Sequence, residues 1–350
     1  MNSAHFIGPF LWYLIVMFSF AMYVVLDGYD LGIGMLLLTE RRDEWRDEMM
    51  EITSTVWDGN ESWLILIAVA LFGGFPLAYS IILPALYIPL IVMLFSLIFR
   101  GISFEFQAQF PGYSRLWGRS FGAGSVLAAF SQGVILGALV SGIPVKNDLF
   151  SGGPFDFLSP FSILSGLTLM AFYGLLGAGW LAYKTEGDLF ESVRAKGRAL
   201  AVAAFILLVV TLIAVPFVGA FAGGVGPYRL IFIWVLVVGA ALAIGCAYFT
   251  FGRRDDTLPF LCTVLAVLSL IGAGVCAMFP YFVAPSITIW QAASPGGSVN
   301  FLLVGVGLCI PIILIYNAYA YWVFRGKFEL PDLGGAGEET APPNLQRKEG

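Results

Sequence analysis

Residues 78–100 read AYSIILPALYIPLIVMLFSLIFR, an apolar stretch whose single charged residue is the last one, Arg100. About 20 apolar residues are enough to cross the hydrocarbon core of a bilayer as a helix. Similar stretches recur along the chain, of which 59% is hydrophobic and only 12% charged, with a mean hydropathy of +0.87. Soluble domains are nearer half apolar and a quarter charged. The composition therefore predicts an all-α polytopic membrane protein.

We predict nine transmembrane helices. They span 8–38, 55–74, 78–100, 118–142, 160–184, 199–220, 228–251, 258–280 and 300–324. The first would be about 46 Å long at 1.5 Å per residue, so it must tilt or project from the bilayer. The second is the weakest of the nine, because it begins with the polar run Asp58-Gly59-Asn60-Glu61.

Positive charge falls almost entirely on one side of these spans. Of the 18 lysines and arginines, only Lys146 and Arg229 lie on the other side. The positive-inside rule places the basic side in the cytoplasm, so the N-terminus is expected in the periplasm and the C-terminus inside. Without the second span, the first basic loop would lie opposite the others, so the charge pattern favours nine spans over eight.

The basic side holds sixteen residues: Arg41, Arg42, Arg46, Arg100, Arg115, Arg119, Lys184, Arg194, Lys196, Arg198, Arg253, Arg254, Arg325, Lys327, Arg347 and Lys348.

Residues 1–329 are expected to form a single transmembrane domain, because the loops are short and no soluble domain separates from them. Residues 330–350 are rich in Pro, Gly and Glu, which predicts a disordered cytoplasmic tail. The first apolar run lacks a basic leader, so we expect it to remain as a span rather than a cleaved signal.

The chain lacks the residues that metal binding and nucleotide hydrolysis usually require. The chain has one histidine, His5, and no phosphate loop of the form G-x-x-x-x-G-K-[ST]. Its four cysteines lie in late spans without C-x-x-C spacing, which favours a packing role. Copper and zinc sites need clustered His or Cys, which are missing here. We therefore predict neither a metal site nor ATP hydrolysis by a phosphate loop.

Two carboxylates lie near the end of the first span. Asp27 and Asp30 are three residues apart, so they share a helical face. Ionisable residues in spans are costly and mark functional sites, and neighbouring carboxylates suit proton transfer. The alternative is that both lie at the cytoplasmic helix end, solvated by water or an arginine. Gly28 and Gly32 form a G-x-x-x-G pair on the same helix, a weak packing signal.

A second polar cluster opens the second span. Asp58 could be an N-cap residue, whose charge the helix dipole favours, or an entry carboxylate for protons moving inward. Glu61 shares its face one turn later. Trp57 and Trp63 flank both residues and either shield them from lipid or anchor the helix at the interface.

Arg100 forms a third candidate. It could supply the counter-charge to Asp58 or Asp27, since all three lie toward the same membrane face. Alternatively it is an interfacial arginine that extends its head group to water.

Several motifs resemble subunit II of the cytochrome bd-type quinol oxidases, the family that includes the cyanide-insensitive oxidases. The resemblance runs from about residue 10 to 325, with Tyr29 where Phe is more usual. The matching stretches, in order, are LDGYDLGIG at 26–34, WDGNESWL at 57–64, FP at 75–76 with Tyr79, FRGISFE at 99–105, MFP at 278–280, TIWQAA at 288–293 and PIILIY at 311–316.

The resemblance implies two four-helix bundles plus one additional helix, in the bacterial cytoplasmic (inner) membrane. It implies a haem-bearing subunit I holding haem b and haem d, one or more small single-span subunits, and quinol and O2 as substrates of the complex. This chain would be haem-free, with lipid and not nucleic acid around it. It would support subunit I and supply part of a cytoplasmic proton path for reduction of O2 to water.

For the site residues, the resemblance implies Asp58 as the entry carboxylate, with Asp27, Asp30, Glu61 and Arg100 in the proton path or supporting it electrostatically. Some members also hold a structural quinone, which we place near Trp57.

From the residues alone, the main alternative is a secondary transporter with carboxylates in its path. Transporters often have internal repeats and broken helices near the midplane. Here the carboxylates gather toward one face, and no internal repeat is evident, which favours the oxidase subunit.

Overall fold

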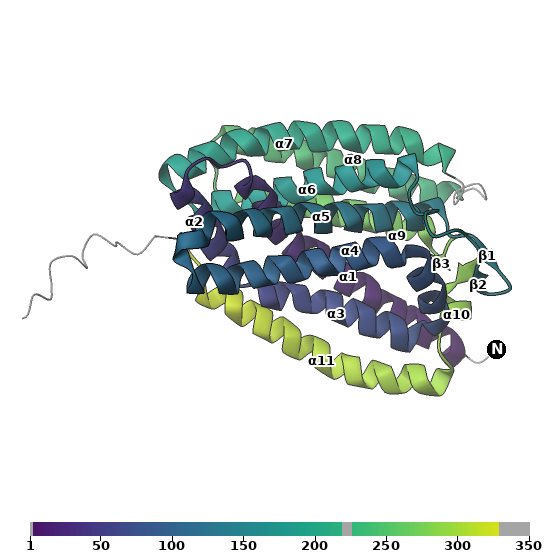
Figure 1. The fold of residues 1–350 in the computed structure, drawn as a ribbon. Coiled ribbons are helices and arrows are strands. Elements are labelled where there is room, and N and C mark those ends of the chain that lie inside the picture. Colours follow the sequence, from purple (N-terminus) through teal and green to yellow (C-terminus); the bar gives the residue numbers. More distant parts are fainter. Residues whose placement is uncertain (1–2, 219–225, 329–350) are drawn as a thin grey trace, which may run out of the picture.

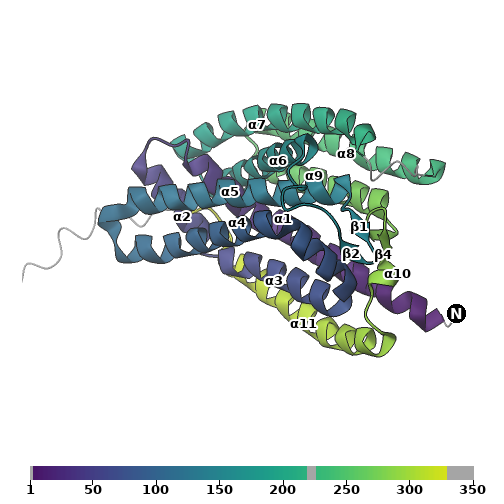
Figure 2. The same ribbon diagram turned by 45° about the vertical axis from the view of Figure 1, so that its right-hand side comes forward.

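The computed structural model describes residues 3–218 and 226–328. They are almost entirely helical, with long helices running side by side (Figures 1 and 2). The helices are α1 (Ser3–Leu37), α2 (Asp43–Ser54), α3 (Trp57–Gly74), α4 (Pro76–Gln109), α5 (Ser114–Ser141), α6 (Pro160–Lys184), α7 (Gly187–Ala214), α8 (Pro227–Gly252), α9 (Leu258–Met278), α10 (Ile289–Ala292) and α11 (Gly296–Val323), with 3-10 turns at Pro111–Tyr113 and Val215–Phe217.

Eight helices of the described chain are long and apolar enough to cross a membrane: α1, α4, α5, α6, α7, α8, α9 and α11. The prediction of an all-α polytopic membrane protein is therefore confirmed. The predicted span 55–74 does form a helix, α3, but its first two turns are polar and it is not among the eight. The ninth span stays a prediction. The predicted tail, residues 330–350, lies outside the described residues.

Two helices extend well beyond the predicted spans. Helix α4 continues past Arg100 to Gln109, and α7 begins at Gly187 rather than at residue 199. Hydropathy marks only the part of a helix that lies in hydrocarbon. Half of the residues in 187–198 are good helix formers, so the helix continues without a fully apolar sequence; they are Leu189, Glu191, Arg194, Ala195, Lys196 and Arg198.

Two short hairpins lie at one end of the molecule, the end at which α1 begins (Figure 1). Strands β1 (Val145–Lys146) and β2 (Leu149–Phe150) pair antiparallel, as do β3 (Tyr281–Val283) and β4 (Ile287–Thr288). Helix α10 follows β4, with the Thr288 and Gln291 side chains completing a capping box at its start. The chain segments expected outside the membrane thus gather at one end.

The opposite end, which we call the basic end, comprises α2, the α4–α5 turn with the start of α5, the α6–α7 and α8–α9 turns, and residues 324–328 (Figure 1). Arg115 contacts Asp43 at 2.5 Å, and Lys327 contacts Asp256 at 3.0 Å. The hydrogen bond from Lys327 lowers the pKa of the Asp256 carboxyl below its ordinary value. Basic residues that are far apart in sequence therefore meet at one end.

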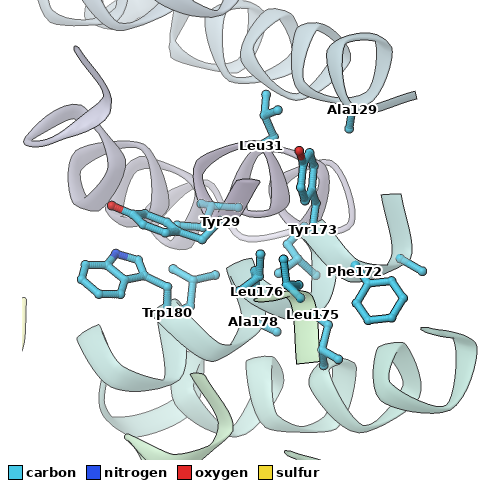
Figure 3. Close-up of a cluster of buried hydrophobic side chains, with 14 of the residues drawn as sticks. Tyr29, Leu31, Ala129, Phe172, Tyr173, Leu175, Leu176, Ala178 and Trp180 are labelled. Atoms are coloured by element: carbon cyan, nitrogen blue, oxygen red, sulfur yellow. The ribbon is translucent and has the colours of Figure 1, made fainter. Parts of the chain in front are cut away.

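Helices α1 and α6 are in backbone contact. A Cβ on Gly32 would lie 1.8 Å from the Tyr173 carbonyl oxygen, and one on Gly28 would lie 2.7 Å from the Tyr173 ring. Figure 3 shows Tyr29 of α1 beside Trp180 of α6, in the larger core cluster, and the centroids of these two stacked rings are 4.6 Å apart. The glycine pair noted in the sequence thus permits this approach, which carries the Asp27–Asp30 turn into the protein interior.

The remaining helices surround this pair. Helices α3 and α5 pack against α1, and α4 packs against α5. Helices α7 and α9 pack against α6, α8 packs against α7 and α9, and α5 also packs against α6. Helix α11 lies at the outside, along α1 and α3 (Figure 2). Its large apolar side chains, such as Phe301 and Leu308, are mostly exposed on this chain, as expected for a helix that faces lipid.

Candidate functional site

Three helices contribute to a buried ion cluster. Arg100 of α4 donates through Nη1 to Asp27 Oδ1 of α1 at 2.5 Å, and through Nη2 to Glu61 Oε2 of α3 at 3.1 Å. The side chains of Arg100 and Asp27 are fully buried, whereas that of Glu61 is 24% exposed. One guanidinium therefore joins two carboxylates from different helices.

Asp30 belongs to an adjoining hydrogen-bond network. The Asn60 amide nitrogen donates to Asp30 Oδ2 and to the Tyr29 hydroxyl, both at 2.8 Å. Tyr321 of α11 donates to Asn60 Oδ1 at 2.8 Å, and its hydroxyl lies 2.5 Å from that of Tyr29. The network therefore fixes α11 to α1 and α3 through side-chain hydrogen bonds.

An open cleft of about 450 Å³ lies between α3 and α11, next to these networks. Its lining consists of Asp58, Gly59, Glu61, Ser62, Ile65, Ile312, Ile313 and Tyr316. Asp58 is exposed in it, and Glu61 both lines the cleft and contacts Arg100. Glu61 thus connects the cleft to the buried ion cluster.

Several polar atoms of the cluster have no protein partner. Asp27 Oδ2, Asp30 Oδ1 and Arg100 Nε are buried and make no hydrogen bond to any described residue. A buried polar atom without a partner costs about 1–3 kcal/mol. Such an atom in a native protein indicates strain, a catalytic role or a bound water or ion, and a free carboxylate oxygen is an acceptor for a proton or a water molecule.

The structure decides among the alternatives for these residues. Asp27 and Asp30 are fully buried away from bulk water, and Asp27 is paired with an arginine, Arg100, as the alternative interpretation allowed. Arg100 is also fully buried, so the interfacial interpretation is wrong; its partners are Asp27 and Glu61 rather than Asp58. Val56 occupies the N-cap position of α3, with Asp58 inside the first turn, so the capping interpretation is wrong as well.

Nearly the whole chain is similar to known proteins. The family model for cytochrome bd terminal oxidase subunit II matches residues 8–324. The chain belongs to this family. It is therefore a subunit of a terminal oxidase, an oxidoreductase complex, and a multi-pass protein of the bacterial inner membrane.

Relatives match this bd subunit II over nearly their full lengths. Subunit 2 of cytochrome bd-I ubiquinol oxidase from Escherichia coli (strain K12) is 28% identical, over 93% of this chain and 96% of the relative. Cytochrome bd ubiquinol oxidase subunit 2 from Bacillus subtilis (strain 168) is 25% identical, over 91% and 96%. A chain in the structure of bd oxidase from Geobacillus thermodenitrificans has the same fold, with a TM-score of 0.72 at 18% identity, covering 93% of this chain and all of that one.

Trp57 lies beside the site without lining the cleft. Its ring stacks on Phe104 with centroids 5.3 Å apart, and it packs against Gly101, whose added Cβ would lie 3.2 Å from the indole. Trp63 is fully buried, so it shields the interior rather than anchoring the helix at the interface. The predicted quinone contact at Trp57 is not tested by these contacts.

The sequence interpretation missed several site residues. Asn60 was seen only as part of a polar run, and Tyr321 was not noted, although the two are hydrogen-bonded. It also missed Gln132, which donates to Tyr23 and accepts from Tyr173, both at 2.7 Å. The sequence did contain a signal for Gln132. A glutamine in the middle of an apolar span needs a buried hydrogen-bond partner.

The donor groups of this bd subunit II site do not fit a haem. Haem iron takes an axial His, Cys, Met or Tyr, whereas the buried cluster offers carboxylates, a guanidinium and an amide. The adjoining network has two tyrosines, Tyr29 and Tyr321, and their hydroxyls are already hydrogen-bonded to each other. Among the described residues, no group of three or more His, Cys, Asp or Glu side chains could hold a metal ion. His5 lies in α1, but its side chain is outside the described part.

Proposed function

We propose that this chain is the haem-free subunit of a quinol:oxygen oxidoreductase and acts beside a haem-bearing subunit I. Two of its relatives are ubiquinol oxidase subunits by name. Quinol and O2 are then the substrates of the complex, and haem b and haem d belong to subunit I. Small single-span subunits and a structural quinone near Trp57 are part of the same proposal. Family membership favours this function over a secondary transporter.

Within that complex, we propose that the chain provides the entrance of a proton path from the cytoplasm. The observation that carries this proposal is the double position of Glu61, which lines an open cleft and also contacts buried Arg100. Asp58 in the same cleft is the group that meets water first. Protons would pass from Asp58 to Glu61 and on to Asp27 and Asp30, whose free oxygens can accept them.

Arg100 does not carry protons, because a guanidinium stays protonated in proteins. Its charge stabilises the ionised forms of Asp27 and Glu61 in a low-dielectric interior. With three carboxyl groups near one arginine, one carboxylate can stay paired with the guanidinium while another carboxyl group gains or loses a proton. This electrostatic support is the role we assign to Arg100.

The haem-free role has a direct test. The expressed chain, purified alone, is expected to contain no stoichiometric haem by pyridine haemochrome assay. In the intact complex, His5→Ala removes the single histidine of this chain and is expected to leave haem content and spectrum unchanged. Loss of one haem in His5→Ala, or stoichiometric haem in the isolated chain, would contradict the proposal.

We further propose nine spans with a periplasmic N-terminus, arranged as two four-helix bundles (α1, α3, α4, α5 and α6, α7, α8, α9) with α11 as the additional helix. Packing of α1 with α3 and α5, and of α6 with α7 and α9, supports the two bundles. Residues 330–350 would form a cytoplasmic tail after a single domain.

Labelling of introduced cysteines tests this topology. With the native cysteines replaced by serine, Arg41→Cys and Ala195→Cys are expected to react with an impermeant maleimide only from the cytoplasmic side. Lys146→Cys, at the exposed β1–β2 hairpin, is expected to react only from the periplasm. If α3 does not cross, Arg41→Cys and Ala195→Cys will label from opposite sides.

A further inference from the structure

Two cysteines on neighbouring helices bring their sulfur atoms together. Cys246 of α8 and Cys262 of α9 have their Sγ atoms 2.9 Å apart, and both are free thiols. A disulfide bond is 2.03–2.05 Å long, so its formation needs a sulfur movement of only about 0.9 Å. The other two cysteines, Cys276 and Cys309, are also free thiols, and no sulfur–sulfur contact is found for them among the described residues.

The pair lies on an exposed apolar surface of this chain. Leu242 and Phe249 of α8 are 70% and 66% exposed, and Leu261 and Leu265 of α9 are 53% and 58% exposed. Cys246 is itself exposed. No other described segment of this chain covers these side chains, so hydrocarbon can reach the pair from this face.

The pair also lies below the membrane surface. Cys246 precedes the end of α8 at Gly252 by about 9 Å of helix, and Cys262 follows the start of α9 at Leu258 by about 6 Å, at 1.5 Å per residue. The charged residues Arg253, Arg254, Asp255 and Asp256 occupy the turn between the helices. A redox partner for the pair must therefore be soluble in the bilayer rather than a charged thiol such as glutathione.

We propose that Cys246 and Cys262 form a reversible redox site, closed to a disulfide by a quinone dissolved in the bilayer. Each thiol loses one electron and one proton, and the two sulfurs form the S–S bond. The quinone accepts both electrons and both protons and becomes a quinol. The disulfide joins α8 to α9 across the 253–257 turn. The reaction needs only quinone in the membrane, so it does not depend on the proton path proposed above.

Counting thiols in membranes that contain the full complex tests this proposal. Membranes are reduced, washed without oxygen, exposed to a fully substituted short-chain ubiquinone, denatured, and labelled with a polyethylene glycol maleimide that shifts the subunit on a gel. The wild-type chain is expected to show four reactive thiols before quinone and two after it. Dithiothreitol is expected to restore all four.

Serine variants identify the pair. Cys246→Ser and Cys262→Ser are each expected to show three reactive thiols both before and after quinone. The control variant, Cys276→Ser with Cys309→Ser, is expected to fall from two thiols to none. Four thiols in the wild type after quinone would overturn the proposal. So would loss of a thiol in Cys246→Ser, or a loss that dithiothreitol does not reverse, because both indicate covalent addition of quinone to a single cysteine.

Discussion

Replacing Arg100 with leucine is expected to prevent most assembly of the oxidase complex. The variant leaves Asp27 fully buried without its cation and removes one partner of Glu61. Breaking a buried ion pair by removing one partner costs about 3–5 kcal/mol, which is a large part of the stability of an ordinary protein. The measurements are the yield of assembled complex in membranes and its thermal unfolding temperature in detergent.

Arg115→Leu is the matched control for Arg100→Leu. Arg115 also contacts a carboxylate at 2.5 Å, that of Asp43, but its side chain is 71% exposed at the basic end. Exposed ion pairs contribute little to stability, so this variant should assemble normally. Adding Asp27→Asn to Arg100→Leu should restore part of the yield, because the fully buried carboxylate that pairs directly with Arg100 is then replaced by a neutral amide. Equal behaviour of the two leucine variants would argue against the buried-pair account.

Asp58→Asn is expected to leave an intact complex that consumes oxygen slowly. Asparagine keeps the size and polarity of the side chain, and α3 loses no cap because its N-cap residue is Val56, but asparagine cannot titrate. Positioned proton-transfer groups contribute roughly 10²–10⁴-fold to rates. Since Asp58 lies in an open cleft where water can replace part of its role, we expect a loss of about tenfold or more in quinol-dependent oxygen uptake.

Companion variants locate the proton path. Glu61→Gln should slow oxygen uptake at least as much as Asp58→Asn, because Glu61 alone connects the described lining of the cleft with Arg100. Asp58→Glu should recover part of the activity. Ser62 also lines the cleft, but its hydroxyl does not titrate at neutral pH. Ser62→Ala should therefore behave as wild type. Full activity in an intact Asp58→Asn complex would leave Asp27, Asp30 or Glu61 as the remaining candidates.

The amino-acid sequence by itself determined the class of protein and most of its helices. Membrane helices must be apolar over a known length, so the hydropathy of a segment such as 160–184 predicts a span without knowledge of its neighbours; that segment is helix α6 with the same ends. The motifs around Asp27, Asp58 and Arg100 likewise indicated the family. The hydropathy of a helix is a local property, and the family motifs depend only on the order of residues in the chain.

Only the tertiary structure decided which side chains meet. The sequence left Asp27 and Asp58 as equal partners for Arg100, and the structure pairs it with Asp27 and Glu61. It also joins Asn60 to Tyr321, 261 residues away, and Cys246 to Cys262. Such pairings depend on which helices approach closely, as α1 and α6 do at Gly32. The rotation and depth of each helix are set by side-chain packing over the whole bundle, which no single segment encodes.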